Sequence, residues 1–203
     1  MTAPGPWNVQ QRQAVPRLYS LAWFFYLLLA ATAVVWIGMR RNGTIDGTLF
    51  FDPSRWPIDL ALGLGAGLVL VGLWELVGRL FSSARRFEEM IGGILGSLDV
   101  GQAIGLAVLS GFAEELFFRG AMQEAWGFWI ATALFAALHT GRQKGLWVWT
   151  VFALIAGLLF GGLVLYTGNL LAAMIGHVVV NAVNLTRLAR RRVASPAVSG
   201  ESA

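Results

Sequence analysis

Two adjacent carboxylates and a guanidinium lie within one short, strongly apolar stretch of the sequence, GFAEELFFRG, as Glu114, Glu115 and Arg119. An ionisable side chain near the centre of a membrane helix costs roughly 2.5–3.5 kcal/mol on insertion scales, so these groups need partners, water or a function. The only two histidines of the chain, His139 and His177, lie in later apolar stretches. Carboxylates and imidazoles together can exchange protons with a water molecule, which is the chemistry of general acid–base catalysis.

The positions of the charges on a helix indicate different roles for the two carboxylates. Glu115 and Arg119 are four residues apart, with the acid on the N-terminal side, which is the favourable order for a pair on one helical face. Glu114 is rotated by about 100° from Glu115, so one guanidinium cannot serve both equally well. Glu114 is therefore the carboxylate without a local partner and the candidate general base. The alternative, from this segment alone, is a buried ion-pair network that only stabilises helix packing.

Two further pairs of residues each share one face of a predicted helix. His139 follows Phe135 by four residues, and Asn181 follows His177 by four. A single histidine in an apolar helix is more often a packed, hydrogen-bonded side chain than a catalytic one. Here both histidines lie in apolar segments, one shares a face with an asparagine, and a separate helix supplies an unpaired acid. We therefore predict one site built from Glu114, His139, His177 and Asn181.

The composition indicates the elements that must position these residues. The 203 residues are 57% hydrophobic and 13% charged, with a mean hydropathy of +0.66, whereas a soluble domain carries about 25% charged residues. Continuous apolar runs predict spanning helices, because lipid requires every backbone polar group to be satisfied within its own element. We predict an all-α, polytopic transmembrane bundle of about six spans: Leu18–Met39, Ile58–Leu80, Gly101–Gln123, Trp126–Thr140, Leu146–Tyr166 and Leu170–Leu188. The fourth is shorter than the ~20 residues that cross a bilayer.

An amphipathic segment and two flanking regions complete the predicted organisation. Residues 81–98 mix charged with apolar side chains, which predicts an amphipathic helix lying at the membrane interface. Gly63 and Gly67 are four apart in the second span, a spacing that lets a neighbouring helix approach closely. The predicted divisions are a polar lead at 1–17, a transmembrane domain at 18–189 with its motif-bearing core at 101–189, and a basic, disordered tail at 190–203.

The charges predict topology and exclude several functions. The net charge is +4, but no basic face with interleaved aromatic residues exists, so we exclude nucleic-acid binding. The absence of cysteine excludes disulfides, thiol nucleophiles and thiolate metal sites. With six spans, eleven Lys and Arg residues fall on the side of the termini and three on the other, with Arg119 inside the membrane. This bias predicts both termini in the cytoplasm. The short chain without a cleaved leader indicates a bacterial cytoplasmic-membrane protein.

Three spaced motifs resemble those of a known family. Glu114-Glu115-x-x-x-Arg119, Phe135-x-x-x-His139 and His177-x-x-x-Asn181 are similar, in order and spacing, to the motifs of the CAAX protease and bacteriocin-processing family. That family includes the type II CAAX prenyl endopeptidases and many bacterial Abi-type membrane proteins. The resemblance covers about 110–185. It implies an all-helical bundle with a cavity open towards the cytoplasm and hydrolysis of peptide bonds within the membrane.

The resemblance also implies roles for single residues. Glu114 and His139 would activate the attacking water, and His177 and Asn181 would stabilise the oxyanion. The supporting residues would be Glu115, Arg119 and Phe135. The implied partners are a peptide or membrane-protein substrate and the lipid bilayer. Because bacteria rarely present prenylated CAAX substrates, the resemblance does not define the substrate.

A catalytic metal stays open as an alternative at this stage. Glu114, His139 and His177 could supply three zinc ligands with an open fourth position. The HExxH arrangement, which places two ligands one helical turn apart, is absent from the sequence. We favour a glutamate-type protease without a cofactor over a zinc metalloprotease.

Two other classes of function compete with hydrolysis. A non-catalytic membrane scaffold or immunity protein would keep the polar cluster only for packing. A small proton-coupled transporter would use the buried acids as a relay, but the sequence shows no paired inverted repeat of the kind many transporters have. The first prediction is therefore an intramembrane endopeptidase acting near the cytoplasmic face.

Overall fold

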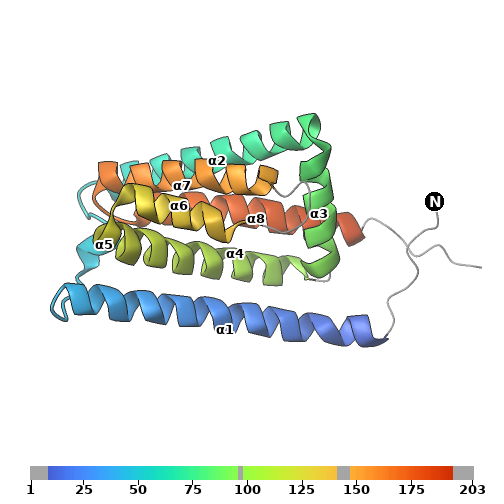
Figure 1. Cartoon of the computed structure of the whole chain (residues 1–203), viewed down its shortest axis with the longest axis horizontal. Coiled ribbons are helices and arrows are strands. Elements are labelled where there is room, and N and C mark those ends of the chain that lie inside the picture. Colours follow the sequence, from blue (N-terminus) through green and yellow to red (C-terminus); the bar gives the residue numbers. More distant parts are fainter. Residues whose placement is uncertain (1–8, 96–97, 141–146, 194–203) are drawn as a thin grey trace, which may run out of the picture.

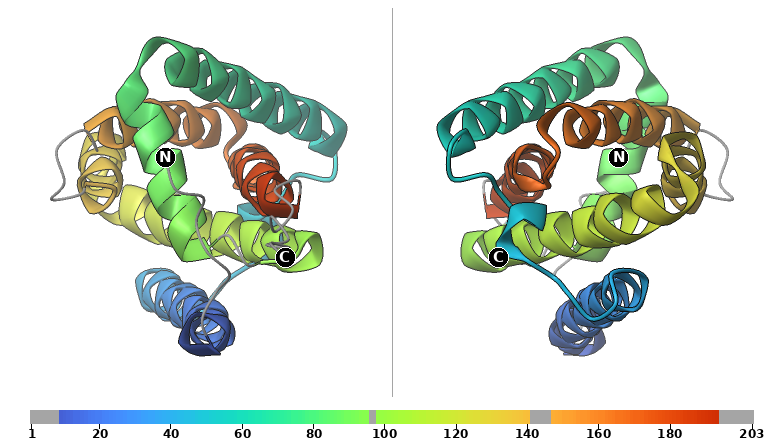
Figure 2. Two further views of the ribbon diagram at one scale, coloured as in Figure 1. Left: turned by 90° about the vertical axis from the view of Figure 1, so that its right-hand side faces the viewer. Right: turned by 90° about the vertical axis from the view of Figure 1, so that its left-hand side faces the viewer.

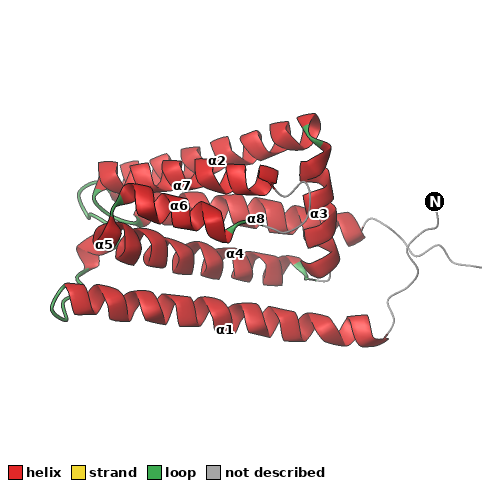
Figure 3. Ribbon diagram, in the orientation of Figure 1, coloured by secondary structure: helices red, strands yellow, loops and turns green. Residues whose placement is uncertain are grey.

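In the computed structural model, residues 9–95, 98–140 and 147–193 are described, and within them the chain is helical apart from short connections (Figures 1 and 3). The elements in chain order are α1 (Val9–Arg40), η1 (Gly47–Leu49), α2 (Trp56–Leu80), α3 (Ser82–Leu95), α4 (Val100–Glu115), the π-helix η2 (Leu116–Gln123), α5 (Glu124–Trp126), α6 (Phe128–Leu138), α7 (Trp147–Thr167) and α8 (Leu171–Val193).

Five helical segments of the described chain are long and apolar enough to cross a membrane: α1 from Leu18, α2, the run from α4 to α5, α7, and α8 to Arg190. The predicted all-α, polytopic bundle is confirmed. The fourth predicted span is the exception, because α6 has only 11 residues, about 16 Å at the α-helical rise. Gly127 precedes it at φ +88°, a conformation that side-chain-bearing residues avoid, and separates α6 from α5. Its C-terminal end brings His139 inside the bundle.

Helix α8 lies against both α2 and α4, and glycines allow this close packing (Figure 2). A Cβ on Gly63 would stand 2.5 Å from the carbonyl oxygen of Ala172, and one on Gly67 would stand 2.8 Å from that of Gly176. The predicted close approach at these two glycines is therefore present, and its partner is α8. Gly111 of α4 has the same role, since its Cβ would lie 3.0 Å from the backbone nitrogen of Val178.

Helix α1 lies along the outside of α4 and η2 (Figure 1). Its inner face includes Ala33 and Ile37, which are fully buried against Leu116. Its opposite side exposes a row of large apolar side chains, including Phe24 and Leu28, as expected of a face in contact with lipid.

The amphipathic segment predicted at 81–98 is helical over Ser82–Leu95, and α3 crosses one end of the bundle (Figure 1). It is attached by aromatic contacts: Phe87 stacks on Trp149 of α7 with ring centroids 4.6 Å apart. The Trp74 indole of α2 donates a hydrogen bond of 2.9 Å to Glu88. The N-terminal end of α1 and the C-terminal end of α8 lie on the same side of the bundle as α3 (Figure 1).

Both predicted flanking regions are partly helical. Helix α1 begins at Val9, within the predicted polar lead, and α8 continues to Val193, within the predicted tail. Arginine is a good helix former, so the basic run after the last span continues the helix. The rest of the predicted lead and tail, 1–8 and 194–203, lies outside the described residues.

At the other end of the bundle, sequence reasoning missed a buried polar cluster. Asp59 of α2 is fully buried and pairs with Arg55 at 2.9 Å. The Asn169 amide donates to the second Asp59 oxygen at 2.7 Å, while its own oxygen accepts from the Leu171 backbone at the start of α8. The cluster connects α2 to the α7–α8 turn, so we assign it a structural role.

Candidate active site

The two carboxylates of the first motif are the last residues of α4, and Arg119 lies in the π-helix that continues it. All three are buried: Glu114 is 8% exposed, Glu115 0% and Arg119 3%. The widened i→i+5 turn of a π-helix is frequently found at functional sites, and the sequence did not predict it.

The predicted pair of Glu115 and Arg119 is present, with a separation of 2.8 Å between Nη1 and Oε1. The guanidinium also lies 4.4 Å from the centroid of the Phe135 ring and donates towards the carbonyl of Gly157 at 3.4 Å. Glu115 has a second partner that the sequence did not reveal, because the same Oε1 is 2.7 Å from Nδ1 of His177. The buried pair therefore extends to α8.

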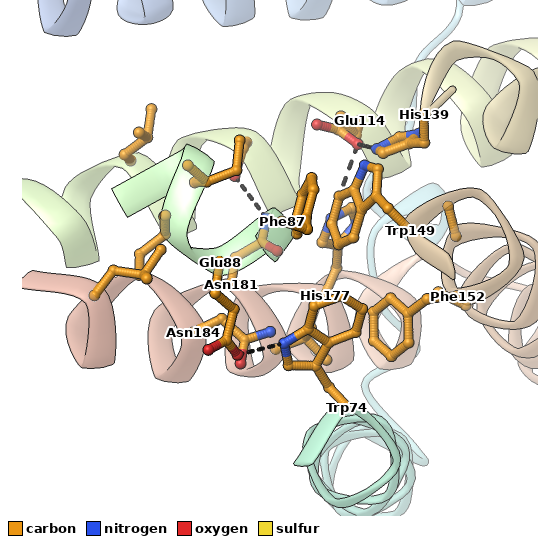
Figure 4. A pocket seen from close by; sticks show the side chains of 18 of the residues that line it. Trp74, Phe87, Glu88, Glu114, His139, Trp149, Phe152, His177, Asn181 and Asn184 are labelled. Carbon is orange, nitrogen blue, oxygen red and sulfur yellow. Dashed lines mark hydrogen bonds and ion pairs between the residues drawn. The ribbon is translucent and has the colours of Figure 1, made fainter. Parts of the chain in front are cut away.

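Glu114 faces both histidines of the chain (Figure 4). Its Oε2 lies 3.9 Å from Nε2 of His139 and 3.8 Å from Nε2 of His177. This oxygen is buried and has no direct hydrogen-bond partner in the described parts of the chain. The carboxylate and the two imidazoles, which come from three segments far apart in sequence, thus lie close together.

In each histidine, the partner of Nδ1 determines which ring nitrogen carries the proton and where Nε2 points. Nδ1 of His139 is 2.7 Å from the carbonyl oxygen of Phe135. Since a carbonyl only accepts, Nδ1 carries the proton, and Nε2 of the neutral ring is a free acceptor. Nδ1 of His177 faces the Glu115 carboxylate, which assigns its proton in the same way. Both Nε2 atoms are thereby directed towards Glu114.

Asn181 lies one helical turn after His177 and lines the same cavity. Its amide donates a 2.9 Å hydrogen bond to the hydroxyl of Ser110 on α4. Ser110 is buried and was not singled out from the sequence, because a serine in a small-residue helix has no distinctive pattern. The predicted site residues are therefore neighbours, with Asn181 held by α4.

A cavity of about 330 Å³ extends from Glu114 to α3. One wall is aromatic, and charged or amide side chains lie both at the Glu114 end and near α3. The labelled residues in Figure 4 that line it are Trp74, Phe87, Glu88, Glu114, His139, Trp149, Phe152, His177, Asn181 and Asn184. At the end near α3, Arg187 lines the cavity and pairs with Glu75 of α2.

The donor types at this site, two imidazoles and a carboxylate, are those that zinc binds. Neighbouring ligand atoms of a tetrahedral zinc with bonds of 2.0–2.1 Å stand roughly 3.3 Å apart. Here the Oε2–Nε2 separations are 3.8 and 3.9 Å. In the described part of the chain, no group of three or more His, Cys, Asp or Glu side chains is arranged to hold a metal ion. The arrangement does not fit zinc as it stands.

Comparisons with known proteins match the segment that carries all three motifs. Residues 96–183 match the family model described as type II CAAX prenyl endopeptidase Rce1-like, a family of proteases. A stretch of 90 residues is 36% identical to the uncharacterized protein YpbD of Bacillus subtilis (strain 168), covering 44% of this chain and 47% of that protein. The chain thus spans about half the length of this relative. No solved structure matches the chain. The resemblance predicted from the motifs is confirmed over this segment.

Proposed function

We propose that this chain, whose motif-bearing segment resembles the type II CAAX prenyl endopeptidases, is an intramembrane endopeptidase of the glutamate type. The observation that carries the proposal is the convergence of Glu114, His139 and His177 in a buried cavity large enough for a peptide segment. The substrate class is a peptide or a membrane protein. The cavity reaches the end of the bundle where α3 lies, which we assign to the cytoplasmic face of a bacterial membrane from the Lys and Arg bias.

The separations at Glu114 suit an attacking water. Gaps of 3.8 and 3.9 Å are too long for direct hydrogen bonds, but a water about 2.8 Å from each heavy atom bridges such a gap. Glu114 then accepts one proton of the water as its oxygen attacks the peptide carbonyl carbon, and Nε2 of His139 accepts a hydrogen bond from the other. Burial strengthens these interactions, because the local dielectric constant is far below that of water.

The carbonyl oxygen becomes negatively charged when the water adds. The candidate donors to this oxygen are the amide of Asn181 and, when a second proton is bound at its Nε2, the His177 ring, a contribution typically worth about 3–4 kcal/mol for a well-placed donor. The C–N bond then breaks, and the proton taken up by Glu114 passes to the leaving amine. Glu115, which is paired with Arg119, holds the His177 ring in place through its contact with Nδ1.

The test compares the parent protein with Glu114→Gln in native membranes, by mass spectrometry of newly formed peptide N-termini. We expect cleavage products with the parent and none with Glu114→Gln, because the amide cannot accept the proton of the water. Glu124→Gln is the control: it removes a partly exposed carboxylate paired with Arg41 beyond the π-helix. It should cleave as the parent does. Equal cleavage by Glu114→Gln contradicts the proposal, and a phenotype retained by that variant supports a non-catalytic scaffold.

A second measurement addresses the metal. The purified protein is equilibrated with a strong chelator, its bound zinc is measured, and the cleavage reaction is repeated. We expect metal-free protein to cleave fully. Loss of cleavage that zinc alone restores would contradict the glutamate-type mechanism and assign Glu114, His139 and His177 as ligands.

A further inference from the structure

Helix α1 lies outside the segment matched by the family model and contributes to none of the three motifs. One of its faces nevertheless packs against the helices that carry the first motif. The side chains on it recur every three or four residues, the spacing of a helix-packing seam: Tyr19, Trp23, Tyr26, Ala30, Ala33 and Ile37.

The close contact of this face with α4 is visible at Gly105. A Cβ there would lie 3.4 Å from the hydroxyl oxygen of Tyr19 and 3.6 Å from the Trp23 ring. One turn further along α1, Tyr26 lines the catalytic cavity. Within the described residues it is the side chain through which α1 reaches that cavity. Glu114 lines the same cavity.

We propose that Tyr26 is a positioning residue for the candidate general base, and that α1 thereby completes a site whose other residues all lie in the motif-bearing segment. The inferred contact rests on the packing of α1 on α4 and on the cavity that Tyr26 and Glu114 both line; its catalytic consequence rests on the proposed function.

The physical reason lies in the freedom of the Glu114 side chain. A buried carboxylate with one oxygen lacking a direct partner can rotate about its terminal bond, which is a soft torsion. A hydroxyl donor fixed on a packed aromatic ring has only two torsions of its own and loses little entropy in holding the carboxylate. With the plane of the carboxylate held, Oε2 stays directed at Nε2 of both His139 and His177.

The kinetic test uses Tyr26→Phe in the full-length protein, with a peptide that spans the cleavage site identified for the parent. The variant keeps the ring that packs on α4 and loses only the hydroxyl. We expect kcat to fall about tenfold to a hundredfold with KM unchanged, the usual effect of removing a group that orients a catalytic side chain. Tyr19→Phe is the matched control, since it removes a hydroxyl from the same face outside the cavity, and its kinetics should equal those of the parent. Parental kcat in Tyr26→Phe overturns the proposal.

An infrared measurement tests the contact independently of proteolysis. The carboxyl band of Glu114 is assigned as the band missing from the acid-minus-neutral difference spectrum of Glu114→Gln. We expect this band to change position in Tyr26→Phe, because the carboxyl group loses a hydrogen bond, and to stay in place in Tyr19→Phe. An unchanged band in Tyr26→Phe overturns the positioning contact. If the parent cleaves nothing but the band moves, the proposed function fails and the contact stands.

Discussion

At the scale of single residues, Glu115 connects the site to the packing of the helices. Its Oε1 lies 2.8 Å from the Arg119 guanidinium and 2.7 Å from Nδ1 of His177, while Glu114, the next residue, faces the cavity. The two adjacent carboxylates therefore have different surroundings, because successive residues of a helix point about 100° apart. A buried charge that loses its partner is strongly destabilising, whereas a buried polar group beside a cavity can be rehydrated.

We therefore expect Glu115→Leu to destabilise the protein by about 3–5 kcal/mol, because it leaves the Arg119 guanidinium buried without its carboxylate. Glu114→Gln should change the free energy of unfolding by less than about 1 kcal/mol, since its neighbours keep their own partners. Denaturant titration in mixed micelles measures both. Similar stabilities for the two variants would show that Glu115 is not the structural partner assigned to it.

At the scale of elements, the position of the site depends on how closely α8 approaches α2 and α4. His177 and Asn181 lie on the segment of α8 that packs on Gly111 of α4, and the same helix packs on Gly63 and Gly67 of α2. In lipid, where apolar burial drives helix association only weakly, small residues permit the backbone contacts that stabilise a bundle. Moving α8 outward would separate the histidine from Glu114.

The glycines of α2 provide a matched comparison. Gly63→Ala should destabilise the protein by about 1–3 kcal/mol, the usual cost of overpacking, because the added Cβ would stand 2.5 Å from a backbone oxygen of α8. Gly65→Ala, where nothing lies within 4 Å of the new Cβ, should be neutral or stabilising, because alanine favours the helix by about 0.5–1 kcal/mol. Thermal unfolding in detergent ranks the two variants. The reverse ranking would contradict the α2–α8 contact.

At the scale of the whole molecule, α3 lies at one end of the bundle with the N-terminal end of α1 and the C-terminal end of α8 (Figure 1). The connection between α1 and α2 lies at the opposite end. This arrangement agrees with an even number of membrane crossings when the short helix α6 is counted together with the five long segments. The cavity reaches the α3 side, so the sidedness of the protein decides which compartment the cavity faces.

Because the chain has no cysteine, single-cysteine variants report this sidedness directly. Thr44→Cys lies in the exposed connection after α1, and Ser82→Cys lies at the exposed start of α3. With both termini in the cytoplasm, a membrane-impermeant maleimide should label Thr44→Cys in intact cells and Ser82→Cys only after lysis. The opposite labelling pattern would invert the topology and place the cavity on the outer side.

The sequence by itself determined the features that depend on local spacing and on composition. The hydropathy predicted the polytopic helical bundle, and the i,i+4 rule predicted the Glu115–Arg119 pair. The sequence grouped Glu114, His139 and His177 into one candidate site, and the structure places both imidazoles within 3.9 Å of the carboxylate. Their catalytic roles stay predictions.

Only the tertiary structure decided which partners came from distant helices. The contact of His177 with Glu115, the bond of Asn181 to Ser110 and the position of Tyr26 at the cavity follow from interhelical packing. Such contacts join residues separated by tens of positions, so the periodic spacing of residues within one helix cannot predict them. The shortening of α6 also depended on packing and on a single glycine conformation. Local order thus specified the helices and their faces, while close packing selected which faces meet.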